Sequence, residues 1–336
     1  MKKIKENKID YKKYLLVINV FLLFVIIILA FIVIINSKNN DNKISISHDV
    51  NGPFLLTNPI LDCEVNNNKN TAIFSKDVHS KVEELKNKYS TPNISFYFRD
   101  LNNGSWIGIN EKDIFSPASL LKVPVFMALL HNAEANPSLL DRKVKVYAAD
   151  FVQDVNPNIV ASDLLSIDKE YSLFEIAKSM IQKSDNTAIS ILIKNIKDGS
   201  IDDVFKSIGI PLITNNNEFE IRVKDYAGFF RVLFNASYLN REMSEKALEV
   251  LSLSEYTGGI VGGLPKGITV AHKFGERNID GSEGNIQLHD CGIVYFPQKP
   301  YIFCAMTRGN NFENQNKAIE ELSSFIYNEV DKNVDL

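Results

Sequence analysis

Cysteine is scarce in this sequence, and its few histidines do not form a metal-binding pattern. Only 3 cysteines occur among the 336 residues, so a framework of disulfides does not hold the fold together. The histidines show none of the close, regular spacing that zinc sites use, and we expect no metal and no cofactor. They are His48, His79, His131, His272 and His289.

A strong excess of charge is also lacking, because the formal net charge is only −4 at pH 7. Proteins that bind nucleic acid usually carry a basic patch or a high pI, so we expect no nucleic-acid partner. The length and the 45% hydrophobic content predict one large domain or two modest ones, with a substantial buried core.

One long apolar run without a charged residue lies near the N-terminus, from Tyr14 to Ile35. It is long enough to cross a bilayer as a helix, and the lysine-rich residues 1–13 before it favour a cytoplasmic N-terminus. No small-residue cleavage pattern follows the run. We therefore interpret residues 14–36 as an uncleaved single-pass anchor in the cell membrane, with the rest of the chain extracytoplasmic. A cleaved signal peptide is the alternative.

Residues 37–75 are rich in asparagine, lysine and serine, a composition that is typical of an extended tether. Two short apolar islands, GPFLL and NPILDC, interrupt this segment and can dock on a folded domain. We place that folded domain at residues 76–336.

Apolar periodicity within residues 76–336 predicts an α+β fold. An amphipathic helix comes first, and the runs ISFYFRDL and SWIGIN, separated by NNG, predict a β-hairpin. Residues 125–250 show helical spacing, with a kink or an early stop expected at Pro124. Three strand-like runs and a final helix follow: GITVAHKFG, HDCGIVYF, YIFCAMTRG and ENQNKAIEELSSFIYNEV. The simplest architecture is an antiparallel sheet flanked by the N- and C-terminal helices, with an all-helical lobe inserted and one transmembrane helix before it.

The stretch FSPASLLKVPVF places Ser119 and Lys122 three positions apart, on one face of the helix predicted there. This spacing alone decides nothing, because SIDK at residues 166–169 has it too, in a polar stretch where a chance match is the better interpretation. Lys-x-Gly also occurs twice, as KDG at 197–199 and as KFG at 273–275. The first of these ends a predicted helix and reads as a stop signal.

Order and context are more informative than any single motif. The Ser119 segment is followed by SDNT at 184–187, between two helical runs, and then by HKFG on a predicted strand. Ser-x-x-Lys, Ser-Asp-Asn and Lys-x-Gly in this order resemble the motif set of class A β-lactamases and penicillin-binding proteins. Similar segments recur in the same order over roughly residues 76–331, including PASLLKVPV, YSLFEIAKSMIQKSDNTA and TGGIVGGLPKGITVAHKFG.

The resemblance implies an active-site serine hydrolase that forms an acyl-enzyme on Ser119. A serine hydroxyl needs an adjacent base, and Lys122 would serve if nearby positive charge and desolvation lower its pKa. Lys273 would supply such a charge and attract a substrate carboxylate. Ser184 would relay a proton to the leaving nitrogen. Asn186 would hydrogen-bond the substrate amide and help to orient Lys122.

Three further roles follow from the same comparison. The backbone N–H groups of Ser119 and Glu276 would form an oxyanion hole. Gly275 would let the substrate lie close to the strand, and Asp185 would turn inward to hold the lobe together. Asn186 is also a candidate helix N-cap.

The sequence departs from the family in two places. Phe274 stands where the family usually has Thr or Ser, whose hydroxyl helps to hold the substrate carboxylate; a phenyl ring cannot donate that bond, and one pointing into the cleft would favour a more apolar substrate. The family's long loop with a deacylating glutamate is mostly deleted here. Glu218 and Glu220 are the acids at about the right distance from Ser184, and we assign neither of them that role.

Three functions therefore stay open. The first is a β-lactamase with weak β-lactam hydrolysis, which we favour. The second is a D,D-peptidase or penicillin-binding hydrolase that acts on cell-wall peptide. The third is a non-catalytic binding or sensor module. For Cys291 and Cys304, on neighbouring predicted strands, we expect buried thiols rather than a disulfide.

Overall fold

A computed structural model of the chain describes six stretches: residues 54–59, 69–151, 158–159, 162–215, 218–278 and 286–332. Among these residues no helix is long and apolar enough to span a membrane. The predicted basic tail, the anchor at 14–36 and most of the predicted tether lie outside the described residues.

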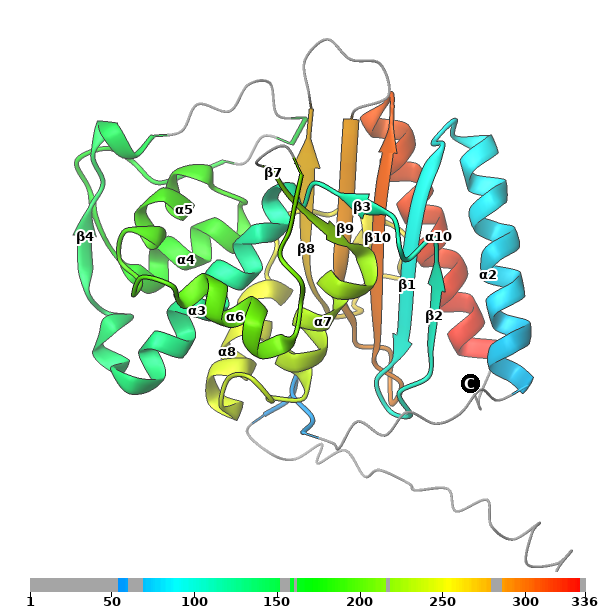
Figure 1. Cartoon of the computed structure of the whole chain (residues 1–336), viewed down its shortest axis with the longest axis horizontal. Helices are drawn as coiled ribbons and strands as arrows, with labels where there is room; N and C mark the ends of the chain where they lie inside the picture. The colour runs from blue at the N-terminus through cyan, green and yellow to red at the C-terminus, as the bar shows by residue number, and fades with distance from the viewer. Residues whose placement is uncertain are drawn as a thin grey trace, which may run out of the picture. The chain divides into compact units, whose positions relative to one another are not determined.

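A five-stranded antiparallel sheet forms the centre of the folded part, as the sequence predicts (Figure 1). Its N-terminal hairpin and its three late strands are the ones expected from the apolar runs. The strands lie in the order β2 (Trp106–Ile109), β1 (Asn93–Asp100), β10 (Tyr301–Gly309), β9 (Ile286–Val294) and β8 (Val270–Arg277). The strand β8 that carries Lys-x-Gly is therefore an edge strand.

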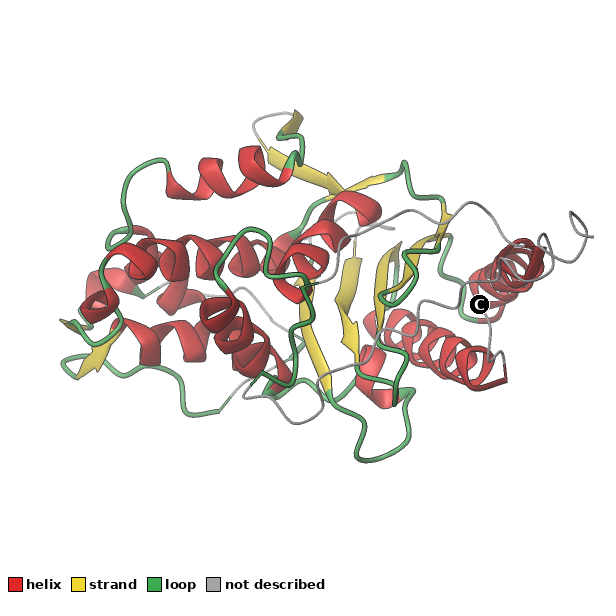
Figure 2. Ribbon diagram, turned by 90° about the horizontal axis from the view of Figure 1, so that it is seen from below, coloured by secondary structure: helices red, strands yellow, loops and turns green. Residues whose placement is uncertain are grey.

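The two terminal helices cover one face of this sheet, which confirms the predicted flanking arrangement (Figures 1 and 2). Helix α2 (Lys69–Lys88) and helix α10 (Phe312–Lys332) pack against each other and against the strands. Their apolar stripes meet strand residues in one core, since side chains at i, i+3 and i+4 share a helix face. This core includes Val78, Val82, Leu85, Phe96, Phe303, Ile319, Leu322 and Ile326.

The other face of the sheet carries the helical lobe. Helix α7 (Val223–Phe234) packs on β1 and β10, and α8 (Arg241–Ser252) packs on β8. The lobe is completed by α3 (Lys122–Ala135), α4 (Leu173–Gln182), α5 (Asn186–Ile193) and α6 (Ser200–Ile208). A second large core joins the lobe to the sheet, with α3 buried along most of its length.

The segment predicted as all-helical also contains short strands, so that prediction was wrong in detail. Strand β7 (Glu218–Arg222) pairs with β6 (Ile213–Asn215) and with β3 (Ile114–Phe115), and β4 (Lys143–Lys145) pairs with β5 (Glu170–Ser172). Each strand has at most five residues, which is too short for a period of two to stand out in the sequence. The short helical segments are η1 (Ala118–Leu121), η2 (Pro137–Leu139), η3 (Ala148–Asp150) and α9 (Gly259–Gly262).

Pro124 neither kinks nor ends its helix. Helix α3 begins at Lys122, so Pro124 lies in the first turn, where backbone N–H groups have no partner within the helix. The expectation of a break was wrong because the helix starts two residues before the proline rather than further upstream.

Cys291 and Cys304 form a disulfide, which corrects the expectation of two thiols. The two residues stand directly opposite each other in the register of β9 and β10, and both are fully buried. Neighbouring strands bring directly opposed side chains within bonding reach. Only the register, which the sequence did not reveal, places these two sulfur atoms together.

Residues 54–59 lie against the domain rather than extending away from it. The Glu245 carboxylate on α8 accepts hydrogen bonds from the backbone N–H groups of Leu55, Leu56 and Thr57, at 2.6–2.9 Å. The Tyr295 hydroxyl donates to the carbonyl oxygen of Leu56. The described part of the apolar island GPFLL, residues 54–56, therefore docks on the folded domain.

Candidate active site

Ser119 lies in the short 3-10 helix η1, immediately before α3. Lys122 is the C-cap of η1, and its backbone N–H donates to the carbonyl oxygen of Ser119, so the two residues lie one 3-10 turn apart and are aligned. The residue before the serine, Ala118, has a backbone φ of 49°, a left-handed conformation that non-glycine residues seldom adopt. Such conformations persist only where the surrounding structure enforces them, and they concentrate at functional sites.

The Lys122 side chain is buried among oxygen atoms of the two serines and the asparagine singled out by the motifs. Its Nζ atom lies 3.0 Å from the Ser119 hydroxyl and 3.0 Å from the Ser184 hydroxyl. It also donates to the backbone oxygen of Ser184 and to the side-chain oxygen of Asn186. With only 2% of the residue exposed, this amine is held in one position beside Ser119.

The Ser-Asp-Asn motif forms the junction of α4 and α5. Ser184 has a φ of 58°, a second left-handed residue at this site. Asp185 is the N-cap of α5: its carboxylate accepts hydrogen bonds from the N–H groups of Thr187 and Ala188 and from the Ser179 hydroxyl. The inward role expected of Asp185 is thus observed. The capping role considered for Asn186 is wrong, because Asn186 is the first helical residue and its side chain contacts Lys122.

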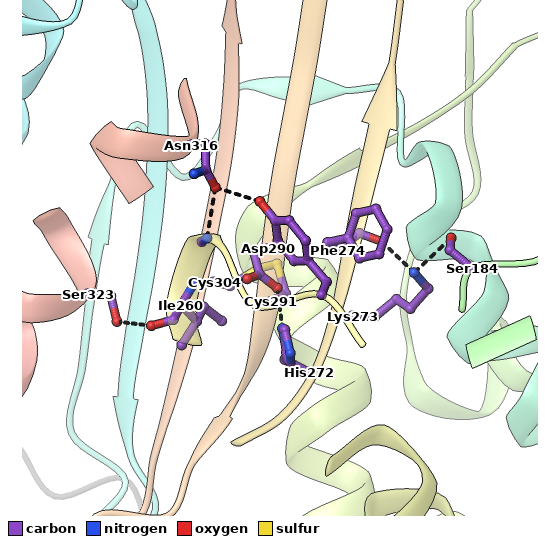
Figure 3. Close-up of polar contacts among 12 residues, drawn as sticks. Ser184, Ile260, His272, Lys273, Phe274, Asp290, Cys291, Cys304, Asn316 and Ser323 are labelled. Carbon is purple, nitrogen blue, oxygen red and sulfur yellow. Dashed lines mark hydrogen bonds and ion pairs between the residues drawn. A yellow bond between two sulfur atoms is a disulfide. The ribbon is translucent and has the colours of Figure 1, made fainter. Parts of the chain in front are cut away.

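Lys273, on strand β8, contacts the Ser184 hydroxyl from the side of the sheet (Figure 3). Its Nζ atom donates to the Ser184 hydroxyl at 2.9 Å and to the carbonyl oxygen of Phe274 at 2.8 Å. Burial is the main cause that lowers the Lys273 pKa well below its usual range, and the nearby Lys122 acts in the same direction. Ser184 therefore lies between two buried lysines and can exchange a proton with either.

Phe274 does not line an open apolar cleft. Its ring is buried, and it packs on Tyr256 with 4.4 Å between ring centroids. The centroid of the same ring lies 3.9 Å from the Lys273 Nζ atom. The phenyl group thus fills the space beside this nitrogen.

Behind this ring lies a buried histidine–aspartate contact that sequence analysis missed. Nδ1 of His272 is 2.8 Å from a carboxylate oxygen of Asp290, which stands opposite Phe274 in the register of β8 and β9 (Figure 3). The other Asp290 oxygen accepts the N–H of Ile260 at 2.9 Å. No local motif marks these residues, because they come from three separate segments.

Gly275 lies where β8 meets the turn that carries the serine. A Cβ atom added there would lie 3.0 Å from the Pro117 oxygen and 3.1 Å from Leu120. The absence of a side chain therefore lets the edge strand approach η1 closely. This approach brings the strand that carries Lys273 next to Ser119.

The side chain of Glu276 extends across to the lobe. Its carboxylate accepts hydrogen bonds from the backbone and side-chain N–H groups of Asn158, at 3.1 and 3.0 Å, and from the N–H of Ile159 at 3.2 Å. Strand β8 is thereby connected to residues 158–159. The sequence suggested only a backbone role for Glu276.

Glu218 and Glu220, the two glutamates considered as deacylating bases, lie on strand β7. Glu218 pairs with Arg277 at 2.7 Å, and this guanidinium lowers the Glu218 pKa. Glu220 lies on β7, where it pairs in register with Ile213. One Glu220 carboxylate oxygen is buried without a hydrogen-bond partner.

Two residues that sequence analysis missed hold the nucleophile turn. The Tyr226 hydroxyl donates to the backbone oxygen of Leu120 at 3.0 Å, and Nε2 of His289 donates to the backbone oxygen of Ser116 at 2.9 Å. The second ring nitrogen of His289 accepts the N–H of Thr307, so the ring is neutral and fixed in one tautomer. Burial lowers the His289 pKa to about 4. Both residues are far from Ser119 in sequence, so no spacing reveals them.

Comparison with known proteins identifies the family and the fold of this chain. Residues 77–330 match the model of the beta-lactamase enzyme family. Among solved structures, PBP-A is 21% identical with a TM-score of 0.64 and covers 76% of this chain and 97% of its own. TLA-3 extended-spectrum beta-lactamase is 17% identical with a TM-score of 0.67 over 76% of this chain and 99% of its own. A class A beta-lactamase from Mycobacterium abscessus is 17% identical with a TM-score of 0.63, over 75% and 98%. At these identities the structures establish a shared fold.

Proposed function

The chain belongs to the beta-lactamase enzyme family, and we propose that it is a serine hydrolase that forms an acyl-enzyme on Ser119. One observation carries the proposal: the Lys122 amine lies within hydrogen-bond distance of both the Ser119 and the Ser184 hydroxyls, and Ser184 in turn contacts Lys273. These four side chains form one continuous path for a proton.

Acylation begins when neutral Lys122 takes the proton of Ser119. The serine oxygen attacks the substrate carbonyl carbon, and the C=O electron pair moves onto oxygen, where the N–H groups of Ser119 and Glu276 would stabilise it. When the C–N bond breaks, the proton passes from Lys122 through the Ser184 hydroxyl to the leaving nitrogen. The product is an ester on Ser119 and a free amine.

Release of the ester needs a water molecule and a base. Glu218 is engaged by Arg277, and we assign it no part in this step. We therefore propose that hydrolysis of the ester is slow and that β-lactam turnover is weak. A D,D-peptidase or penicillin-binding hydrolase of cell-wall peptide is the second candidate. It is supported by the predicted membrane anchor at residues 14–36 and the extracytoplasmic position proposed for the domain. A variant of PBP-A, which shares this fold, has a solved structure described as an acyl-enzyme complex with penicillin G.

The test uses the full chain in detergent, a chromogenic cephalosporin and penicillin G, followed by intact-mass spectrometry. We expect a slowly decaying adduct on wild-type protein and no adduct on Ser119→Ala. Ser166→Ala, in the second Ser-x-x-Lys match, is the control and should retain the adduct. Rapid turnover that is lost in Ser119→Ala would contradict slow deacylation, whereas adduct formation that persists in Ser119→Ala would contradict the nucleophile. The absence of an adduct with every acyl donor would favour the sensor alternative.

A further inference from the structure

The surroundings of the Lys273 side-chain nitrogen bear directly on which substrates the proposed acyl-enzyme site accepts. This nitrogen donates hydrogen bonds to the Ser184 hydroxyl and to the carbonyl oxygen of Phe274. The Phe274 ring lies against the same nitrogen, 3.9 Å from it to the ring centroid, and Lys273 has no exposed surface. A carboxylate can reach this nitrogen only by displacing the ring or the serine.

The ring is fixed in this position by its neighbours. Tyr256 packs against Phe274 with the two rings tilted by 37°, and its hydroxyl donates to the Asn316 side chain on α10 at 2.6 Å. The same Asn316 oxygen accepts the N–H of Gly259. Gly259 has a φ of 54°, and an added Cβ would lie 2.4 Å from the Asp290 carboxylate, so only glycine fits. Phe274 and Tyr256 therefore form a rigid aromatic wall that cannot swing aside at low cost.

Two acidic residues lie near this wall. Asp290 stands opposite Phe274 in the sheet register and is fully buried, and Glu276 lies two positions after Phe274 on the same strand. The next cation along β8 is Arg277, which is held by Glu218 and by the Ser116 hydroxyl. A substrate carboxylate placed beside Phe274 would meet an aromatic surface and two acids, and a desolvated anion without a partner is strongly disfavoured.

We propose that this site selects acyl donors that carry no carboxylate on the side that faces Phe274, so that uncharged esters and amides are its preferred substrates. The inference rests on the proposed acyl-enzyme function and specifies its substrate class. Phe274 is the residue that determines this specificity, through the space it occupies and the side of Lys273 it covers. The acylation step on Ser119 is the same for these substrates: the serine oxygen bonds to the carbonyl carbon, and the leaving group takes the proton.

The test compares two acyl donors that differ only in the carboxylate. Penicillin G and penicillin G methyl ester are incubated with the full chain in detergent, and the rate of adduct formation on Ser119 is followed by intact mass. A second pair with a thioester in place of the lactam, one member ending in a carboxylate and the other in its methyl ester, uses the same readout. We expect the neutral member of each pair to react at least about tenfold faster.

Phe274→Thr opens the space beside Lys273 and supplies a hydroxyl, so its ratio of ester to acid rates should fall at least about tenfold. Phe274→Leu is the matched control, because it keeps an apolar filling group and should keep the wild-type preference. Each ratio is measured within one variant, so a partly unfolded preparation does not distort it. Faster reaction of the acids with wild-type protein, or an unchanged ratio in Phe274→Thr, overturns the inference alone. No adduct with any of the four compounds overturns the acyl-enzyme function and this inference with it.

Discussion

The Nζ atom of Lys122 lies 3.0 Å from the Oγ atom of Ser119, and both residues are held by groups distant in the sequence. Ser184 and Asn186 fix the amine, while Tyr226 fixes the backbone of the serine turn through Leu120. A general base must lie within hydrogen-bond reach of the proton it removes, and this pair meets that condition without bound substrate.

Replacing Lys122 by Met should abolish acylation while leaving the fold intact. Met has similar length and fills the same buried space, but it cannot accept the Ser119 proton. We expect the acylation rate to fall by about 10²–10⁴-fold, the usual contribution of a general base. Intact-mass time courses measure the rate, and Lys169→Met in the second Ser-x-x-Lys match is the control. Wild-type acylation in Lys122→Met would remove this residue as the base.

Gly275→Ala should damage both stability and acylation. The added methyl group would lie 3.0 Å from the Pro117 oxygen and 3.1 Å from Leu120, so either the edge strand or the serine turn must move. Overpacking of this kind costs about 1–3 kcal/mol. Urea unfolding and acylation rates measure the two effects. Gly228→Ala is the control: its Cβ would meet Ile210 at an ordinary 3.6 Å, and alanine favours the helix. Equal behaviour of the two variants would contradict the close approach of β8 to η1.

His289 should make the folded state acid-sensitive between pH 6.5 and pH 4. Its folded pKa is about 4, below the ordinary value of 6.5, so the unfolded chain binds this proton first as the pH falls. The stabilising effect is complete above pH 6.5 and is lost on the way down to pH 4. A shift of this size corresponds to a loss of about 3 kcal/mol in the free energy of unfolding. Urea unfolding at pH 7 and pH 4.5 measures it.

The control for this pH effect is His289→Gln, which keeps an N–H donor for the Ser116 oxygen but does not titrate. We expect the variant to lose less stability than the wild type over the same pH interval. An identical loss in both proteins would show that another group causes the acid sensitivity.

The disulfide should protect two of the 3 cysteines from alkylation. In denaturant without reductant, only Cys63 should react with iodoacetamide, and all three should react after reduction. Cys291→Ala combined with Cys304→Ala should lower the free energy of unfolding by up to about 3 kcal/mol, as expected for a loop of this length. Mass spectrometry gives the count and urea unfolding gives the energy. Three alkylated cysteines in the unreduced chain would refute the pairing.

Much of the site is evident in the sequence because its parts are short and local. Ser119 and Lys122 are three residues apart, Ser184 and Asn186 are two apart, and Lys273 lies on a clearly apolar strand. Each of these patterns can be recognised from the sequence alone. Their order along the chain distinguished SLLK at 119–122 from SIDK at 166–169. The sheet and its flanking helices were predictable for the same reason, since both helices and every strand of the sheet except β2 extend over eight or more residues.

The remaining features depend on contacts between distant segments. The sequence by itself placed Phe274 between Lys273 and Gly275, but only the tertiary structure packs its ring on Tyr256 and over the Lys273 nitrogen. In the same way, strand register joined Cys291 to Cys304, and the close approach of β8 to η1 gave Gly275 its steric role. Periodicity reports which face of an element is apolar, whereas register and packing depend on how two elements meet. How two elements meet depends on the packing of the whole core. For this reason the motifs identified the proposed reacting serine, whereas the tertiary structure determined which residues surround it.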